Sequence, residues 1–470
     1  MKKIKYAILG AGSAGLTARS EIAKHTDDYL VFDAGTLGTT CARVGCMPSK
    51  VLIQAASDFD RRKKMAEQGI LGAESLTVDR KQTMAHVRKL RDRFVRGVSL
   101  GMEKWQAEKL VREYARFTSP TTLVAGEVEY EFEKAIVAVG TTPMMLTAFK
   151  GHEEYTLNSD SIFEQVDLPD SIAVIGLGVI GIELGQSLAR LGIDVVGIHR
   201  RRNISGIENP EINEYACRHF EGQMKLDFSG LTSVAFKDNK LLLKTGKGEY
   251  QVDKALLCTG RISNLPRTDL HKLSQSFSEF GKPKLVKGSF ALEDQPHIFV
   301  VGDATQEKAI LHEAADEGRI AAFNALSQKN HYFTPRAALG VTFSEPNIAR
   351  AGQSFEELRA AGVDYETGVV TFEGQGRSIV KLKEVGLLHL YGEKGSGKIL
   401  GAEMIGPDAE HLAHLISWVV QSGLNVNEML ALPYYHPVLE EGLRTAVRDL
   451  RNKLKIQTFD LEMGNGELRD

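Results

Sequence analysis

Ile4-Lys-Tyr-Ala-Ile-Leu-Gly10-Ala-Gly12-Ser-Ala-Gly15 stands near the start of the chain and decides its fold class. The apolar residues 4–9 predict a buried strand of a parallel sheet, and a helical stretch follows the glycines. A second strand over 29–32 ends in Asp33. Glycines at this spacing allow a tight turn and a close backbone approach to a pyrophosphate, which binds at the helix N-terminus. Because Asp33 can accept from a ribose hydroxyl, the segment predicts a dinucleotide site.

A second fingerprint follows in the middle of the chain. Gly176-Leu-Gly178-Val-Ile-Gly181 comes directly after the apolar strand Ile172–Ile175. A helix to about residue 191 and a strand over 194–198 complete the unit. Two such units predict two bound dinucleotides, and electron transfer between them is the economical explanation.

The second unit lacks the acid expected at the end of its second strand. His199 stands there, followed by Arg200, Arg201 and Arg202. An acid would accept from the ribose hydroxyls and repel a 2′-phosphate, whereas arginine binds phosphate through paired, charge-assisted hydrogen bonds. The sequence therefore favours NADPH over NADH. The alternative is that the arginines only solvate a loop.

Two cysteines, Cys41 and Cys46, follow the first unit and lie next to the ligand expected there. Pro48 favours a helix start near Cys46. Free N–H groups and the positive dipole end at such a start lower a thiol's pKa. A distorted turn containing Gly45 can bring the two cysteines within bridging distance. The alternative is a pair of buried, inert cysteines.

Composition excludes several classes of partner. The 470-residue chain is 43% hydrophobic and 25% charged with a net charge of −3, which favours neither nucleic acid nor an anionic membrane. Its first apolar run is too short for a signal peptide, and none approaches the roughly 18 residues of a membrane span. Four cysteines suit a reducing compartment, so we expect a cytoplasmic protein in which any disulfide is catalytic.

Two further patterns predict functional side chains. A strand over 298–301 delivers Gly302-Asp303 at its carboxyl end, where open α/β sheets bind ligands. Near the end of the chain, His436 precedes a proline that can start a helix, and Glu441 is one turn into that helix. A carboxylate placed there can hold one imidazole nitrogen and raise the basicity of the ring. The alternative is a coincidental surface pair.

Together these features resemble the FAD-dependent pyridine nucleotide–disulfide oxidoreductases, over residues 4 to about 450. The family's motif GGTCxNxGCxPSK matches residues 38–50, its LxHxAxxEG matches 311–318, and its HPTxxE matches 436–441. Within the family, Ser49-Lys50 is most similar to dihydrolipoamide dehydrogenase, and the lack of a cysteine pair near the C-terminus argues against mercuric reductase. Three residues depart from the motifs: Thr39, Arg43 and Val438.

The resemblance implies FAD over the first fingerprint and NAD(P)H over the second. The FAD residues would be Gly10, Gly12, Gly15, Asp33, Gly140, Gly302 and Asp303. The NAD(P) residues would be Gly176, Gly178, Gly181, His199, Arg200, Arg201 and Gly260. No metal site is expected.

The resemblance also implies roles in catalysis. Cys41 and Cys46 would form the redox-active disulfide, with Cys46 nearer the flavin and Cys41 exchanging with the substrate. His436, polarised by Glu441, would shuttle the proton. Lys50 and Glu183 would pair beside the flavin ring, and a homodimer would deliver each histidine to the partner's disulfide. The substrate would be a small-molecule or lipoyl-domain disulfide or dithiol.

The expected fold class is α/β, with two Rossmann-like dinucleotide-binding domains and a C-terminal α+β dimerisation domain. We expect an FAD domain in two parts (1–148 and 267–334), an NAD(P) domain (149–266) and a dimerisation domain with tail (335–470). Three alternatives differ in activity. One is an NADPH-dependent disulfide reductase of the glutathione-reductase type. The others are a soluble transhydrogenase, which needs no cysteine pair, and a non-enzymatic redox sensor.

Overall fold

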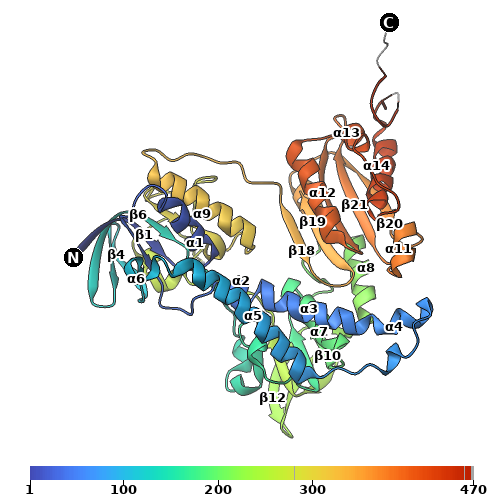
Figure 1. Ribbon diagram of the computed structural model, residues 1–470, viewed down its shortest axis with the longest axis horizontal. Helices are drawn as coiled ribbons and strands as arrows, with labels where there is room; N and C mark the ends of the chain where they lie inside the picture. Colours follow the sequence, from blue (N-terminus) through green and yellow to red (C-terminus); the bar gives the residue numbers. More distant parts are fainter. Residues whose placement is uncertain (280, 460, 467–470) are drawn as a thin grey trace.

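The first fingerprint lies at the carboxyl end of a central strand in a seven-stranded sheet (Figure 1). The computed structural model describes residues 1–279, 281–459 and 461–466. The sheet has the order β3-β2-β1-β6-β5-β4, and β17 also pairs with β6. Its strands are β1 (Lys2–Leu9), β2 (Tyr29–Phe32), β3 (Leu110–Val111), β4 (Ala115–Ser119), β5 (Thr122–Ala125), β6 (Val128–Val137) and β17 (Ile298–Val300).

Helices α1 (Ser13–Ile22) and α9 (Leu311–Leu326) pack on this sheet through a shared apolar core. They touch closely at Gly318, where an added Cβ would lie 2.4 Å from the carbonyl oxygen of Ala14. Since β17 and α9 come nearly 300 residues after β1, the chain leaves the first sheet and later returns to it.

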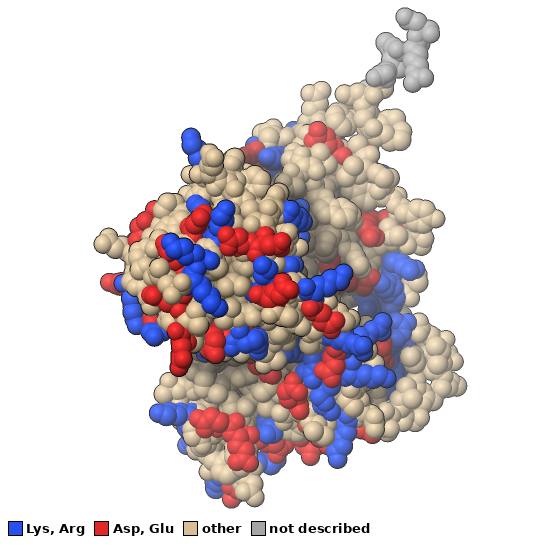
Figure 2. All heavy atoms as spheres, turned by 60° about the vertical axis from the view of Figure 1, so that its left-hand side comes forward, with Lys and Arg blue, Asp and Glu red and all other residues tan. Residues whose placement is uncertain are grey.

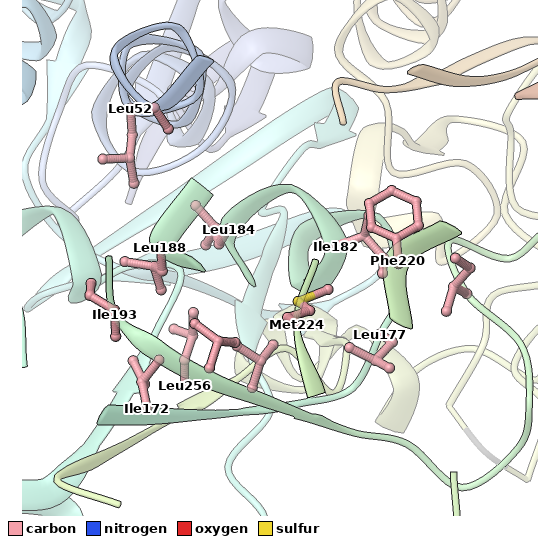
Figure 3. Close-up of a cluster of buried hydrophobic side chains, with 14 of the residues drawn as sticks. Leu52, Ile172, Leu177, Ile182, Leu184, Leu188, Ile193, Phe220, Met224 and Leu256 are labelled. Atoms are coloured by element: carbon pink, nitrogen blue, oxygen red, sulfur yellow. The ribbon is translucent and has the colours of Figure 1, made fainter. Parts of the chain in front are cut away.

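The second fingerprint opens a parallel five-stranded sheet of order β11-β10-β9-β15-β8. Its apolar core includes Leu184 and Leu188 of α7 with Ile172 and Leu256 of the sheet (Figure 3). The strands are β8 (Thr156–Asn158), β9 (Ser171–Ile175), β10 (Asp194–Ile198), β11 (Lys225–Asp227) and β15 (Lys254–Leu257). The helices are α7 (Val179–Arg190) and α8 (Pro210–Glu221). The same unit also contains an antiparallel sheet of three strands, β12 (Leu231–Lys237), β13 (Lys240–Thr245) and β14 (Glu249–Val252). Where the chain crosses between the two units, β7 (Thr141–Pro143) pairs with β16 (Arg261–Ser263).

Helices carry the cysteine segment between the two dinucleotide units. They are α2 (Thr40–Arg43), α3 (Cys46–Asp60), α4 (Arg62–Met65), α5 (Arg80–Met102) and α6 (Gln106–Lys109). Helix α3 lies between α5 and α7, as Figure 1 shows. The two strands β3 and β4 follow these helices and pair at the edges of the first sheet.

The C-terminal part is an antiparallel sheet of order β18-β19-β22-β21-β20 with helices packed on it. Its strands are β18 (Leu339–Thr342), β19 (Asn347–Gly352), β20 (Tyr365–Thr371), β21 (Leu387–Glu393) and β22 (Ile399–Gly406). Its helices are α10 (Phe355–Ala360), α11 (Gly376–Lys381), α12 (Ala409–Ser422), α13 (Val426–Leu430) and α14 (Glu440–Leu454). No local pattern predicts β19, which contains two alanines and an arginine and pairs with a neighbouring strand on each side.

The surface agrees with the mixed charge of the sequence. Figure 2 shows acidic and basic side chains interspersed across one face rather than gathered into a field of one sign. In the described part of the chain, no helix combines the length and apolar character needed to cross a bilayer.

Candidate active site

The glycines of the first fingerprint divide into two kinds. Gly10 has φ +106°, and a Cβ there would lie 2.3 Å from the carbonyl oxygen of Ala138. A Cβ on Gly15 would lie 1.9 Å from the carbonyl oxygen of Gly10. Gly12 faces open space, with no atom within 4 Å of an added Cβ. The outer two glycines are therefore needed by the fold itself, whereas the middle one leaves room for a ligand beside the start of α1.

The second fingerprint repeats this arrangement. A Cβ on Gly176 would lie 2.5 Å from the carbonyl oxygen of Cys258, and one on Gly181 would lie 1.9 Å from that of Gly176. Gly178, like Gly12, faces open space. The Cys258 thiol is packed at this turn, where burial raises its pKa to about 12. Both turns thus fit a pyrophosphate at the start of a helix.

Asp33 is held at the mouth of the first turn. Its carboxylate accepts from the backbone N–H of Ala11 at 2.7 Å and from that of Gly35 at 2.7 Å. Arg112 donates to the carbonyl oxygens of Asp33 and Gly35, both at 2.8 Å, and so fixes the loop. A cavity lined by Gly10, Asp33 and Val139, among others, opens beside the carboxylate. This is a suitable position for accepting from a ribose.

The second acid of the first unit, Asp303, follows β17. Burial raises the pKa of its carboxyl group. The backbone N–H of the preceding Gly302 donates to Glu317 at 2.6 Å, and burial raises the pKa of Glu317 to about 8. Glu317 belongs to the family motif matched at residues 311–318, for which the sequence analysis predicted no role. Its contact shows that it holds the Gly302-Asp303 turn in place.

Two further predicted glycines lie at the crossover between the units. Gly140 has φ +63° and Gly260 has φ +108°. The backbone N–H of Asn264 donates to the carbonyl of Gly140 at 3.0 Å, and its side chain donates to that of Val139 at 3.0 Å. Gly140 directly precedes β7 and Gly260 directly precedes β16, so each glycine forms the turn by which the chain enters this strand pair.

The two cysteines lie together as thiols at the junction of α2 and α3. Cys46 is the first residue of α3, and Gly45 caps it. The thiol of Cys41 donates a hydrogen bond to Cys46, which raises the pKa of Cys41. The same bond, assisted by the charge of Lys50, lowers the pKa of Cys46 to about 7. The surroundings thus favour a thiolate on Cys46 over one on Cys41.

One turn along α3, Lys50 forms an ion pair with Glu183 of α7. The Lys50 ammonium lies 3.0 and 2.9 Å from the two carboxylate oxygens. Glu183 is only 4% exposed and also accepts from the backbone N–H of Phe343 at 2.9 Å. The ammonium lies 4.5 Å from the centre of the Phe343 ring. The pair thus connects the cysteine helix, the second dinucleotide unit and the C-terminal part.

His436 and Glu441 also form a pair. The Nδ1 atom of His436 lies 3.0 and 3.1 Å from the two carboxylate oxygens of Glu441. The backbone N–H of Val438 donates to the same carboxylate at 3.2 Å, and the bond to His436 lowers the pKa of Glu441. The histidine side chain is 80% exposed. Its Nε2 edge faces away from the carboxylate and is accessible to another molecule.

The residues after β10 divide into two groups. His199 accepts from the backbone N–H of Leu177 at 3.3 Å, and burial together with two neighbouring arginines lowers its pKa. Arg202 is paired with Glu214 at 2.8 Å and with Glu221 at 2.5 Å. Arg200 and Arg201 are exposed and have no ion-pair partner in the described part of the chain. Only these two can offer a free guanidinium to a ligand.

Two of the departures from the family motif lie beside the cysteines. Thr39 adopts φ +61°, a region that β-branched residues avoid, and its hydroxyl accepts from the backbone N–H of Ala42 at 3.2 Å. The Nε atom of Arg43 is buried and has no hydrogen-bond partner among the described residues. At Thr39 the backbone therefore has a conformation that glycine adopts freely and that strains a threonine.

Comparisons with known proteins place this arrangement in a class. Residues 4–318 match the family "Pyridine nucleotide-disulphide oxidoreductase", and residues 339–447 match its dimerisation domain. The chain belongs to this family. It is therefore an FAD-dependent enzyme that uses NAD(P)H and exchanges electrons with disulfides.

Individual relatives within the family carry different enzyme names. A dihydrolipoyl dehydrogenase of Vibrio parahaemolyticus is 27% identical over 97% of this chain and 98% of its own length. A mercuric reductase of Acidithiobacillus ferrooxidans is 27% identical over 97% of this chain and 84% of its own length. Among solved structures, the flavoprotein disulfide reductase RclA of Escherichia coli matches with a TM-score of 0.82 at 17% identity, covering 96% of this chain and 99% of that one. LpdA of Mycobacterium tuberculosis matches with a TM-score of 0.81 at 21% identity, covering 95% of this chain and 99% of that one. The match to the dimerisation domain also supports a homodimer.

The lowered pKa of Cys46 can be tested by alkylation. In the reduced enzyme, the rate of Cys46 modification by iodoacetamide should rise with pH through a midpoint of about 7. Cys41→Ala removes the hydrogen-bond donor, so the midpoint should move toward about 8.5. The rate at pH 7 should then fall roughly tenfold, because only a few per cent of an ordinary thiol is ionised there. Mass spectrometry of the Cys46 peptide measures this rate.

Cys41→Ser is the matched control, since its hydroxyl can still donate to Cys46. It should keep a midpoint nearer 7 than Cys41→Ala does. An identical pH profile in the two variants would show that the hydrogen bond has no part in forming the thiolate.

Proposed function

We propose that this enzyme acts on a dithiol or disulfide in the manner of dihydrolipoyl dehydrogenase. The observation that carries the proposal is the position of the two cysteines, with Cys41 in α2 and Cys46 at the start of α3, one turn before the Lys50–Glu183 ion pair. The relatives named dihydrolipoyl dehydrogenase support it. Localisation in the cytoplasm is part of the proposal, supported by the four free cysteines.

The residues would divide the chemistry among them. When bound, the two dinucleotides supply hydride transfer and a route for an electron pair to or from the cysteines. In the direction of disulfide reduction, His436 takes the proton of Cys41, and the Cys41 sulfur attacks the substrate disulfide. This forms a mixed disulfide and releases the first thiolate of the substrate, to which His436 returns the proton. Cys46 then attacks the Cys41 sulfur, which closes the Cys41–Cys46 disulfide and releases the second thiol of the substrate. His436 gives a proton to the departing thiolate, and Glu441 fixes the ring with Nε2 directed outward.

Two other activities share this site. A reductase of the glutathione-reductase type would use the same residues with another disulfide. A transhydrogenase would use both nucleotide turns and leave the cysteines idle, and the lowered pKa of Cys46 argues against it.

A panel of acceptors with purified enzyme tests the proposal. Lipoamide should be reduced by NAD(P)H, and dihydrolipoamide oxidised, at least tenfold faster than glutathione disulfide or a nicotinamide analogue is reduced. Cys41→Ser should abolish turnover of lipoamide, because no mixed disulfide can form. Faster turnover of the nicotinamide analogue, unaffected by Cys41→Ser, would identify a transhydrogenase instead.

We also propose that the nicotinamide substrate is NADPH. The loop after β10 presents Arg200 and Arg201 without partners, and it has no carboxylate at the position of His199. Asp227, the nearest buried acid, cannot take that role. Its carboxylate already accepts from Ser229, Thr245 and Tyr250, and its pKa is lowered to about 2.

Replacing both free arginines should change nucleotide preference. Arg200→Ala with Arg201→Ala should raise KM for NADPH by roughly 10- to 100-fold, because each charge-assisted hydrogen bond contributes about 1.5–3 kcal/mol. KM for NADH should change less than threefold. Arg202→Ala is the control, since Arg202 is already paired with Glu214 and Glu221. A higher kcat/KM for NADH that the double variant leaves unchanged would show that the two arginines only solvate the loop.

The exposed position of His436 supports a site in which its imidazole reaches the cysteine pair of the partner subunit. Among the described residues, the ring hydrogen-bonds only to Glu441. The apolar groove beside it is lined by Trp418, Leu432 and Tyr435, which are 63%, 43% and 80% exposed. These side chains suit the interface of the dimerisation domain to which this segment belongs.

Mixed dimers test this sharing of the site. When Cys41→Ser chains are combined with His436→Ala chains, one site of each mixed dimer receives an intact pair and an intact histidine. Activity should recover to about a quarter of the wild-type sites in a random mixture, since half of the dimers are mixed. The parent variants alone provide the baseline. No recovery, with mixed dimers shown to form, would place both groups in the same chain.

A further inference from the structure

Three arginines form a stripe on α14, the helix that carries Glu441. They are Arg444, Arg448 and Arg451. Because successive residues of an α-helix turn by about 100°, these three and Glu441 fall within about 80° of one another. The opposite face of the helix packs into the core through Leu443, Val447 and other apolar residues.

One carboxylate of the C-terminal tail is seated on this stripe. Glu462 accepts from Arg444 at 2.9 Å, from Arg448 at 2.8 and 2.6 Å, and from Arg451 at 3.3 Å. The arginines lower the pKa of Glu462 to about 2. The stripe therefore already binds a carboxylate.

The stripe is not saturated by that single carboxylate. Three guanidinium groups pair with one carboxylate, and the described residues provide these arginines with no other ion pair. Glu441 acts on Arg444 only at longer range. The Nε atoms of Arg444 and Arg451 are buried without an acceptor. A buried donor without an acceptor is costly, so a second or better-placed anion would be bound favourably.

The stripe adjoins the catalytic histidine. The guanidinium of Arg444 lies 5.6 Å from the centre of the Tyr434 ring, and Tyr434 precedes His436 by two residues. Arg448 follows Glu441 by seven residues, which is about 10 Å along a helix. A flexible acid chain of several carbons spans that distance. A substrate whose sulfurs lie near His436 can therefore place a carboxylate on the stripe.

We propose that Arg444, Arg448 and Arg451 form a carboxylate-binding site for a small anionic disulfide substrate, and that Glu462 occupies it until that substrate binds. This inference rests on the proposed function, because it concerns the substrate of the same site. It distinguishes lipoate from lipoamide, which carry the same dithiolane ring but differ in charge at the end of the chain.

Steady-state kinetics with lipoate and lipoamide test the proposal. Glu462→Gln removes the competing charge, so KM for lipoate should fall threefold to tenfold while KM for lipoamide stays within twofold. Adding Arg448→Gln to Glu462→Gln should raise KM for lipoate again by at least fivefold. Arg359→Gln is the control variant, because this exposed arginine lies elsewhere in the same part of the chain and pairs only with Glu356.

Calorimetric titration with octanoate and octanamide gives a second readout that needs no turnover. Octanoate should bind the Glu462→Gln holoenzyme at least threefold more tightly than the wild type, and octanamide should show no such difference. Equal effects of Glu462→Gln on the charged and neutral ligands would overturn the inference and leave Glu462 as a clasp for the tail. If neither lipoate nor lipoamide is turned over, the proposed function fails, and the titration still decides whether the stripe binds carboxylates.

Discussion

The ion pair between Lys50 and Glu183 joins three parts of the chain at one point. Lys50 belongs to α3, which begins at Cys46, and Glu183 belongs to α7, the helix of the second nucleotide unit. The Phe343 N–H directly follows β18 of the C-terminal part. Lys50 is 32% exposed but Glu183 only 4%, so removing Lys50 would leave the buried carboxylate unpaired and destabilise this contact. The position of the reactive thiol relative to both nucleotide turns therefore depends on this contact. The charge of Lys50 also favours the Cys46 thiolate, so one side chain serves both positioning and reactivity.

The two nucleotide turns have the same close contacts between backbone atoms. In each, the first glycine faces the carbonyl of a neighbouring strand, the third faces the carbonyl of the first, and the middle glycine faces open space. The neighbouring residues are Ala138 in one unit and Cys258 in the other. Cys258, which carries no chemistry, thus occupies a structural position equivalent to that of an alanine. Small side chains are needed at both positions because strand and turn touch there.

The C-terminal part has no nucleotide fingerprint, and it contributes to the candidate site by positioning side chains. Its sheet carries the helix on which Glu441, the arginine stripe and, just before them, His436 are arranged. Exposure of the histidine and of the neighbouring apolar side chains is expected where a second subunit completes the site. The tail returns to the same helix through Glu462, which accepts from the arginines that follow Glu441 on α14.

Local sequence patterns were sufficient to predict the fold class, both nucleotide turns, the start of α3 at Cys46 and the family. Each of these depends on local spacing of glycine, proline and apolar residues, which short segments encode directly. Strands such as β3 and β19 were missed because their residues have weak local preferences and form strands only through pairing with distant neighbours. The pairing of Arg202, the lack of ion-pair partners for Arg200 and Arg201 among the described residues, and the positive φ of Thr39 emerge only in the folded chain. The tertiary structure also brought Glu462 to three arginines and Lys50 close enough to Cys46 to lower the pKa of that thiol. These outcomes depend on charge, burial and contact between groups that are separated along the chain or arranged by the fold, and for that reason no local pattern records them.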